Sequence, residues 1–354
     1  MGGSAKTEKR QSILRVLVLF DGITGVGFHR LYTPYARLQV DEGITVDVSM
    51  KQSEWGDLEY KNYNCVIFNR WLGNLQYNVL PILAKHKIPY IVDLDDYWVL
   101  PKHNPAYKFY RAYIKNGIKD ALHYADGVSV TTPQLLEKAK DFYKGDNIEV
   151  IPNALDLNQS QWKANKDHTP TIGWVGGLSH TEDLKLLENQ IKYVCERYGW
   201  RFLMCGFHEN TKEWAMMEKS ITGESRANRP EWFQTITGTS ADKYGSAYAE
   251  IDIALAPLTK SHFNKHKSEL KIVEAAAYKL PILVSDVEPY TNHRNNLGVY
   301  FVTNNDWVSP LSRLIESGKW KQVGGINYKY CQEHHNLKEI NKTRLSLLQK
   351  VVRK

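Results

Sequence analysis

Two lysines and a glutamate in the second half of the chain have the spacing of a single helix face. Lys267, Lys271 and Glu274 lie at positions i, i+4 and i+7. Lysines near a helix start can bind a diphosphate, and a carboxylate further along can accept hydrogen bonds from both hydroxyls of a ribose. We therefore predict a nucleotide site here, and we assign the neighbouring Ser268 to it as well.

A second group with chemical potential is acidic. Asp93, Asp95 and Asp96 fall within four residues, directly after an expected strand at 90–93. Such carboxylates repel each other unless a cation or a hydroxyl-rich ligand lies between them. Three interpretations stay open: an active-site role in which Asp93 or Asp95 orients an acceptor, a divalent-metal site, or a cluster that caps a helix.

A glycine-rich turn follows the first apolar run. Gly22, Gly25 and Gly27 precede His29 and Arg30, after an expected strand at 13–20. Glycines allow backbone amides to approach an oxygen-rich ligand, and the start of the following helix favours negative charge. The spacing differs from the fingerprint of nicotinamide-binding enzymes, so a ligand contact and a plain tight turn are both possible.

A basic stripe is expected in the first half of the chain. It consists of Lys108, Arg111, Lys115 and Lys119, with Tyr107, Tyr110 and Tyr113 interleaved. One helix would present the four cations on one face. That face could bind a nucleic-acid backbone, could lie on anionic lipid beside a lipid-linked acceptor, or could simply be solvated.

The elements that must position these groups alternate between strand and helix. Short β-branched strands are expected at 13–20, 45–49, 65–69, 90–93, 127–131 and 149–151, and again at 171–175, 201–205, 235–236, 251–255, 281–284 and 299–302. This alternation predicts parallel sheets in two α/β domains. We expect an acceptor-side domain at 12–157, a linker at 158–170, a donor domain at 171–330 with a helix at 181–198, and a C-terminal amphipathic helix at 331–354.

Composition is that of an ordinary globular protein. The 354 residues carry a net charge of +7 and only four cysteines, without CxxC spacing. Cys331 lies near His334 and His335, but without a second pair of ligands we expect no metal site. No run is apolar enough to span a bilayer and no secretory signal is expected, so a cytoplasmic location fits best.

Three segments together resemble a known family. Glu274–Asp286, Val150–Asp156 and Ile172–Gly177 are similar to the "EAxAxGxPVVxS", "VIPNGVD" and donor-domain-opening segments of retaining GT-B glycosyltransferases, the sucrose-synthase and mannosyltransferase-like group. The "GVGxxR", "DxDD" and "KSxxKxxEA" segments resemble a divergent bacterial and phage branch.

The resemblance implies two facing Rossmann-like domains with a cleft between them, a nucleotide-sugar donor, and transfer with retention of configuration. Glu274 matches the second acid of the family's E-x7-E motif and would bind the ribose, whereas His266 stands where the first acid is expected. Gly176 and Gly177 occupy the usual place of a phosphate-binding arginine. The implied donor contacts are therefore Gly25, Gly27, Arg30, Gly176, Gly177, His180, Lys267, Ser268, Lys271 and Glu274.

The resulting hypothesis is a metal-independent glycosyltransferase that uses a UDP- or GDP-sugar and needs no other cofactor. Lys267 would stabilise the leaving diphosphate, and Lys108, Arg111 and Lys115 would contact an anionic acceptor, either DNA or a lipid-linked glycan. Two alternatives remain. One is a metal-dependent GT-A enzyme that uses Asp93 and Asp95, and the other is a non-catalytic nucleic-acid-binding protein.

Overall fold

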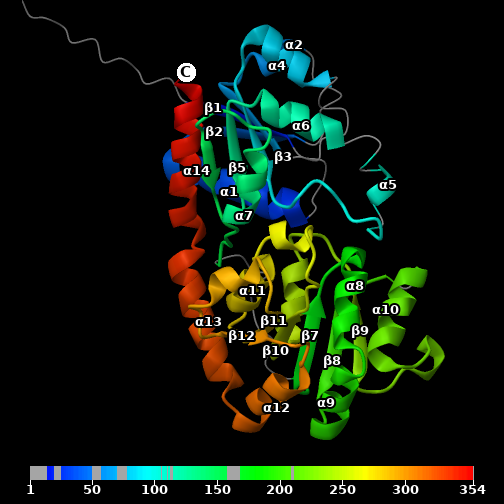
Figure 1. Ribbon diagram of the computed structural model, residues 1–354. Helices are drawn as coiled ribbons and strands as arrows, with labels where there is room; N and C mark the ends of the chain where they lie inside the picture. The colour runs from blue at the N-terminus through cyan, green and yellow to red at the C-terminus, as the bar shows by residue number, and fades with distance from the viewer. Residues whose placement is uncertain are drawn as a thin grey trace, which may run out of the picture.

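The computed structural model describes residues 14–19, 25–49, 57–69, 78–104, 106–109, 111, 115–157, 168–208 and 211–353. These residues form two α/β halves, one above the other in Figure 1. Each half contains one six-stranded sheet in which every pairing is parallel. The expected pair of Rossmann-like domains is confirmed.

The first sheet has the order β2-β1-β3-β4-β5-β6. Its strands are β1 (Arg15–Leu19), β2 (Thr45–Ser49), β3 (Cys65–Asn69), β4 (Tyr90–Leu94), β5 (Gly127–Val130) and β6 (Ile148–Val150). Strands β3, β4 and β5 are buried along their whole length because helices cover both faces of the sheet. The helices of this half are α1 (Thr33–Glu42), α2 (Asp57–Tyr60), α4 (Leu80–His86), α5 (Tyr107–Phe109), α6 (Lys115–His123) and α7 (Pro133–Ala139).

The second sheet has the order β12-β11-β10-β7-β8-β9. Its strands are β7 (Thr171–Val175), β8 (Arg201–Phe207), β9 (Phe233–Thr237), β10 (Ile253–Ala256), β11 (Ile282–Ser285) and β12 (Val299–Val302). The strand order reverses between β7 and β10, and ligands of doubly wound sheets bind beside such a reversal, at the carboxyl ends of the strands. The helices here are α8 (Thr181–Leu184), α9 (Gln190–Tyr198), α10 (Lys212–Thr222), α11 (Leu270–Ala277), α12 (Val308–Ser317) and α13 (Trp320–His334).

Two expected helices differ from the structure. The segment expected as one helix at 181–198 contains α8, a 3₁₀ turn at 185–187 and then α9, because Asn189 adopts a left-handed conformation that interrupts the helical path. The C-terminal segment expected at 331–354 is the end of α13 followed by a separate helix, α14 (Leu337–Val352).

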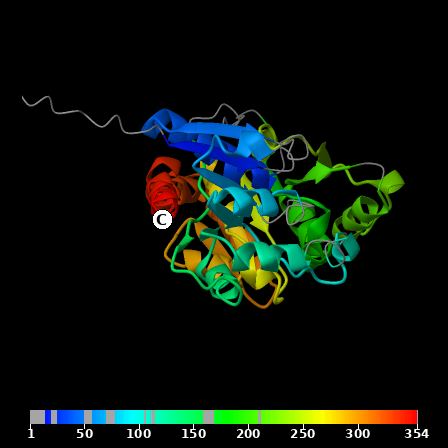
Figure 2. The ribbon, with the colours of Figure 1, turned by 90° about the horizontal axis from the view of Figure 1, so that it is seen from above.

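Helix α14 returns to the first half of the chain. It runs along the upper half in Figure 1 and is seen end-on in Figure 2. Its residues Leu347, Leu348 and Val351 are buried against Val18 of β1 and Ile91 of β4. The chain therefore crosses between the halves twice, once after β6 and once between α13 and α14.

The two crossings lie beside each other. Leu155 of the first crossing forms an isolated parallel bridge with Asn336 of the second. The Nδ1 atom of His335 lies 2.8 Å from the carbonyl oxygen of Asn153. These contacts hold the two crossings together, and we call this region, residues 153–155 with 335–336, the hinge.

Candidate active site

A cavity of about 430 Å³ lies between the halves, at the carboxyl ends of β7, β8 and β9. Gly25 lines it from the first half. The second half contributes Gly176, Gly177, Gly206 and Gly238, together with Tyr244, Lys271 and Glu274. The structure thus brings five of the predicted donor residues to one cavity, namely Gly25, Gly176, Gly177, Lys271 and Glu274.

Bare backbone forms one wall of this cavity. Gly206 has a φ of +96°, and a Cβ atom there would lie 2.0 Å from the carbonyl oxygen of Gly176. Only glycine fits such a position. At Gly177 a Cβ would meet nothing within 4 Å, so the space beside it is open. Because these glycines have no side chains, their backbone N–H groups can approach an oxygen-rich ligand in the open space beside Gly177.

The lining of the cavity also contains a buried carboxylate. Glu274 is 1% exposed on α11 and accepts hydrogen bonds from the hydroxyls of Tyr244 and Tyr248, the latter at 2.6 Å. The Nζ atom of Lys271 lies 3.7 Å from its Oε2 atom. These partners hold Glu274 in place at the cavity and partly balance its charge.

A contact across the cleft reaches this carboxylate from the first half. His29 Nε2 lies 3.0 Å from the hydroxyl oxygen of Tyr244. Burial lowers the pKa of His29 to about 4, although the nearby Glu274 partly opposes this effect. His29 is therefore neutral at physiological pH, and a chain of hydrogen bonds runs from it through Tyr244 to Glu274. His29 belongs to a π-helical segment, Gly27–Tyr32, a distortion that is frequent at functional sites.

Arg30 and Asp93, predicted as donor and catalytic contacts, are bound to each other instead. Arg30 donates to both carboxylate oxygens of Asp93, at 2.7 and 3.0 Å, and the hydroxyl of Ser129 donates to the same carboxylate. The two side chains are only 1% and 2% exposed. Their charges are compensated inside the first half, and neither residue is among those that line the cavity.

The other two aspartates of the acidic segment diverge. Asp95 is buried and its Oδ1 atom lies 3.4 Å from Asn69 Nδ2, while Asp96 Oδ2 lies 3.5 Å from Lys267 Nζ of the second half. Among the described residues, the one group of three metal-ligating side chains lies elsewhere, at Glu269, His293 and His335. With two separate sheets present, the single-sheet GT-A alternative does not fit the fold.

Lys267 does not lie on the expected helix face. Residues 264–266 form a 3₁₀ turn, Lys267 itself is extended, and α11 begins only at Leu270. Its ammonium group lies over the ring of Phe263 at 4.8 Å and pairs with Asp96 across the cleft. Ser268 follows it and is half-buried. Lys271 and Glu274 share the helix as predicted.

Two histidines near the expected donor site have protein partners: His180, which was assigned to the donor, and His266, which stands where the family's first acid is expected. His180 Nδ1 lies 2.8 Å from Asp183 Oδ2, and burial lowers the pKa of His180. His266 Nδ1 lies 2.7 Å from the carbonyl oxygen of His262, and its ring lies 5.1 Å from that of Tyr97 in the first half. His266 thus replaces an acid with a neutral ring at the domain contact.

The expected basic stripe is described only in part. Lys108 on α5 and Arg111 are exposed, and Lys115 is the first residue of α6. Residues 110 and 112–114 lie outside the described part of the chain, so the continuous helix stays a prediction. The ammonium group of Lys119 lies 4.8 Å from the ring centre of Phe142 and so packs on its own domain.

Tyr244 lines the cavity, Tyr248 donates to Glu274 and His29 contacts Tyr244, yet no spacing in the sequence singled out these three residues. Tyr244 and Tyr248 lie in a 3₁₀ segment with no recognisable motif, and His29 contacts a residue 215 positions away. The only available signal was the position of His29 directly after the glycine turn.

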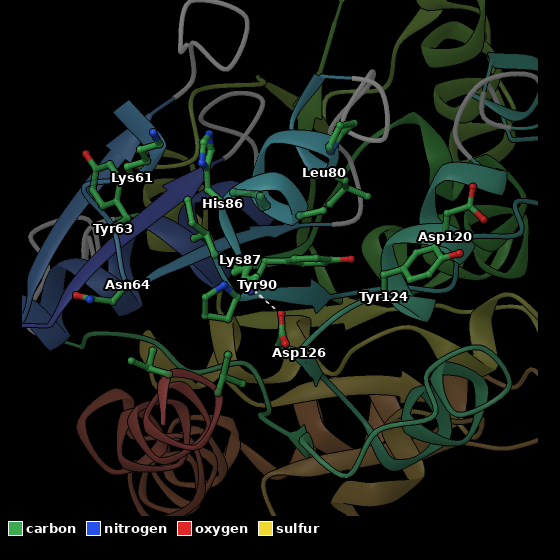
Figure 3. Close-up of a pocket in the computed structure, with 17 residues that line it drawn as sticks. Lys61, Tyr63, Asn64, Leu80, His86, Lys87, Tyr90, Asp120, Tyr124 and Asp126 are labelled. Atoms are coloured by element: carbon green, nitrogen blue, oxygen red, sulfur yellow. Dashed lines mark hydrogen bonds between the residues drawn. The ribbon is translucent and has the colours of Figure 1, made fainter. Parts of the chain in front are cut away.

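A larger cavity, of about 1220 Å³, lies in the first half and is drawn in Figure 3. Asn64, Tyr90 and Asp126 line it, and each stands at the amino end of a strand or just before it. Ligand sites of parallel α/β sheets lie at the carboxyl ends. The Oδ2 atom of Asp126 accepts a hydrogen bond of 3.1 Å from the backbone of Tyr90, a local structural contact. We therefore place the candidate active site in the smaller interdomain cavity.

Solved structures share this two-domain arrangement. HepE from Anabaena in complex with UDP-glucose has a TM-score of 0.67 at 11% identity, over 95% of this chain and 99% of HepE. An α-glucosyltransferase (AGT) in complex with UDP has a TM-score of 0.67 at 14% identity, over 97% and 100%. TarM from S. aureus has a TM-score of 0.60 at 16% identity over 84% of this chain, which spans only 56% of TarM.

The fold and the sequence of the second half point to the same group of proteins. The fold is that of the GT-B glycosyltransferases. Residues 169–317 match the family model of the glycosyl transferases group 1. No curated protein sequence matches the chain. Within the described part of the chain, no helix combines the length and apolar character needed to cross a membrane.

Proposed function

We propose that this enzyme transfers a sugar from a UDP- or GDP-sugar to an acceptor, with retention of configuration and without a metal on the donor. The observation that carries the proposal is the pairing of Lys271 with Glu274 on the wall of the interdomain cavity. A cation and a carboxylate on successive turns match the diphosphate and the ribose of such a donor.

In this arrangement the ribose hydroxyls donate to Glu274 and the diphosphate lies near Lys271. Backbone amides of Gly176 and Gly177 approach the phosphates from the second half, and Gly25 approaches from the first. Lys267 is placed at the cleft by Asp96 and adds positive charge where the leaving diphosphate becomes more negative. Closure of the cleft keeps water from the donor sugar.

We assign no protein nucleophile. Asp93 is compensated by Arg30, so we propose that both act by positioning the start of α1 and the end of β4. Asp95, two residues after Asp93, is the remaining candidate for orienting the acceptor hydroxyl.

We further propose an anionic acceptor. The exposed Lys108 and Arg111, with Lys115 at the start of α6, provide cations in the half that receives the acceptor of a GT-B enzyme. A nucleic-acid backbone and a lipid-linked glycan would both be attracted by this charge, and the salt experiment in the Discussion separates them.

Thermal unfolding in the presence of nucleotides tests the donor proposal. In a buffer without added metal, UDP or GDP should raise the melting temperature, because a ligand that binds only the folded state stabilises it. The corresponding nucleoside monophosphate, which lacks the second phosphate, should raise it less. A melting shift that requires added Mn²⁺ would contradict metal-independent binding, and no shift with any nucleoside diphosphate would contradict the donor site itself.

A further inference from the structure

Three potential metal ligands meet beside the hinge, outside the cavity. Glu269 directly precedes α11, His293 ends a 3₁₀ turn at 290–293, and His335 lies between α13 and α14. One carboxylate oxygen and one nitrogen from each histidine all lie within 4.8 Å of one another. The residues are only 4%, 3% and 7% exposed, and none of them lines the donor cavity.

Two of the three ligand groups contain a buried polar atom that lacks a hydrogen-bond partner. Within the described residues, nothing pairs with Oε1 of Glu269 or with Nδ1 of His293. Such atoms are rare in folded proteins because their desolvation is not repaid. Two of them in one cluster of metal-ligating side chains indicate that a ligand belongs between them.

The third ligand is oriented as metal-binding histidines usually are. Nδ1 of His335 lies 2.8 Å from the carbonyl oxygen of Asn153, so it carries the proton and donates to that oxygen. The lone pair is then on Nε2, available to a metal. The rings of His293 and His335 are nearly parallel, with centroids 5.1 Å apart.

We propose that Glu269, His293 and His335 bind one zinc ion that braces the hinge. Two imidazoles and one carboxylate are a ligand set that zinc accepts, with a water molecule as the fourth ligand. Tetrahedral zinc separates its ligand atoms by about 3.3 Å, so the three side chains must move together by at most about 1.5 Å. The site is distinct from the Cys331, His334 and His335 grouping, for which the sequence predicts no metal site and in which His334 is exposed.

The position of this site links three segments. His335 belongs to the second crossing and is held by Asn153 of the first, while Glu269 lies two residues from both Lys267 and Lys271. Zinc would thus fix the start of α11, the helix that carries Lys271 and Glu274, relative to the hinge. Loss of the zinc ion should weaken the attachment of the start of α11 to the two crossings, without removing any side chain from the donor cavity.

Metal analysis of the full-length protein tests the site. The protein is purified with a tag that contains no histidines, and its metal content is measured by mass spectrometry after gel filtration. We expect close to one equivalent of zinc per chain. After metal removal, titration with Zn²⁺ should restore one equivalent and raise the melting temperature, and Co²⁺ should give the visible absorption of a tetrahedral complex.

Matched variants identify the ligands. His293→Gln and His335→Gln should each reduce the bound zinc to under a tenth, whereas His334→Gln, one residue away and exposed, should retain it, as should Cys331→Ser. Glu269→Gln keeps the size of the side chain, and it replaces a histidine variant in the zinc measurement if that variant fails to fold. A folded wild-type protein that neither contains nor takes up Zn²⁺ or Co²⁺ would overturn the proposal, as would full zinc content in all three ligand variants. These measurements do not depend on donor binding, so a negative result would contradict the zinc site without contradicting the proposed transferase activity.

Discussion

Arg30 and Asp93 form a bidentate ion pair in the buried interior of the first half, and Arg30 also donates a 2.6 Å hydrogen bond to the carbonyl oxygen of Ile151. This arginine therefore connects three segments that are far apart in sequence: the helix after the glycine turn, the end of β4 and the start of the first crossing. The pair fixes the relative positions of these three segments inside the first half.

Breaking this pair should destabilise the protein strongly. Arg30→Met should lower the free energy of unfolding by about 3–5 kcal/mol, because it leaves the Asp93 carboxylate buried without its cation. Denaturant unfolding of the full chain, monitored with a spectroscopic probe in the first half, measures the change. The double variant Arg30→Met/Asp93→Leu should recover much of the loss. As a control, Lys342→Met breaks an exposed ion pair with Glu339 and should cost less than 1 kcal/mol. A cost for Arg30→Met as small as that of the control would contradict the buried pair.

Removal of the buried carboxylate should weaken donor binding. Glu274→Ala should cost about 1.5–3 kcal/mol in the affinity for UDP or GDP, because it removes hydrogen bonds from the ribose to a charged group. Calorimetric titration measures the loss of affinity. A 2′-deoxy nucleotide should already bind the wild type more weakly, and Glu274→Ala should reduce its affinity little further. Glu213→Ala changes an exposed glutamate on α10 and should leave binding intact. Normal nucleotide binding by a folded Glu274→Ala protein would rule out the assigned ribose contact.

Acid should destabilise the protein through His29. Its pKa is about 4 in the folded protein, below the ordinary value of 6.5, so the unfolded chain binds the proton first. Stability is therefore lost as the pH falls from 6.5 to 4, by up to about 1.4 kcal/mol per pH unit for this one group. His29→Gln should reduce the slope of stability against pH by that amount, measured by unfolding at several pH values. The exposed His123 is the control, and His123→Gln should leave the slope unchanged. An equal slope in wild type and His29→Gln would contradict the neutral state of His29.

Salt dependence should reveal the acceptor. If Lys108, Arg111 and Lys115 contact phosphates of duplex DNA, changing all three to Gln should flatten the log–log salt slope of DNA binding by roughly two to three units. If the acceptor is lipid-linked, the same triple variant should instead lose binding to anionic vesicles, at about 1 kcal/mol per basic residue. UDP affinity should be unchanged in either case. If the triple variant changes neither DNA binding nor vesicle binding, the stripe is a solvated surface.

The alternation of strands and amphipathic helices was sufficient to predict all twelve strands that the structure describes. The signal was strongest for fully buried strands such as β3, β4 and β10, because strands buried on both faces need continuous apolar runs. The sharing of α11 by Lys271 and Glu274 was also predictable, since it depends only on local spacing. Lys267 was misplaced because the 3₁₀ turn before it has no strong sequence signal.

Contacts between distant residues could not be predicted in this way. The partners Arg30 and Asp93 are 63 positions apart, and His29 and Tyr244 are 215 apart. Periodicity assigns a residue to a face of its own element, but it does not say which other element that face meets. Both Arg30 and Asp93 were therefore assigned to ligands, although burial directed them to each other.

The return of α14 to the first sheet has a consequence for biosynthesis. A ribosome completes β6 roughly 190 residues before it begins α14, an interval of roughly 10–40 s at ordinary elongation rates. During that time the surface that Leu347, Leu348 and Val351 will cover is bare, and Gly127 has no neighbour at the place where Val351 later packs. The first half should therefore stay sensitive to protease on the ribosome until α14 has left the exit tunnel.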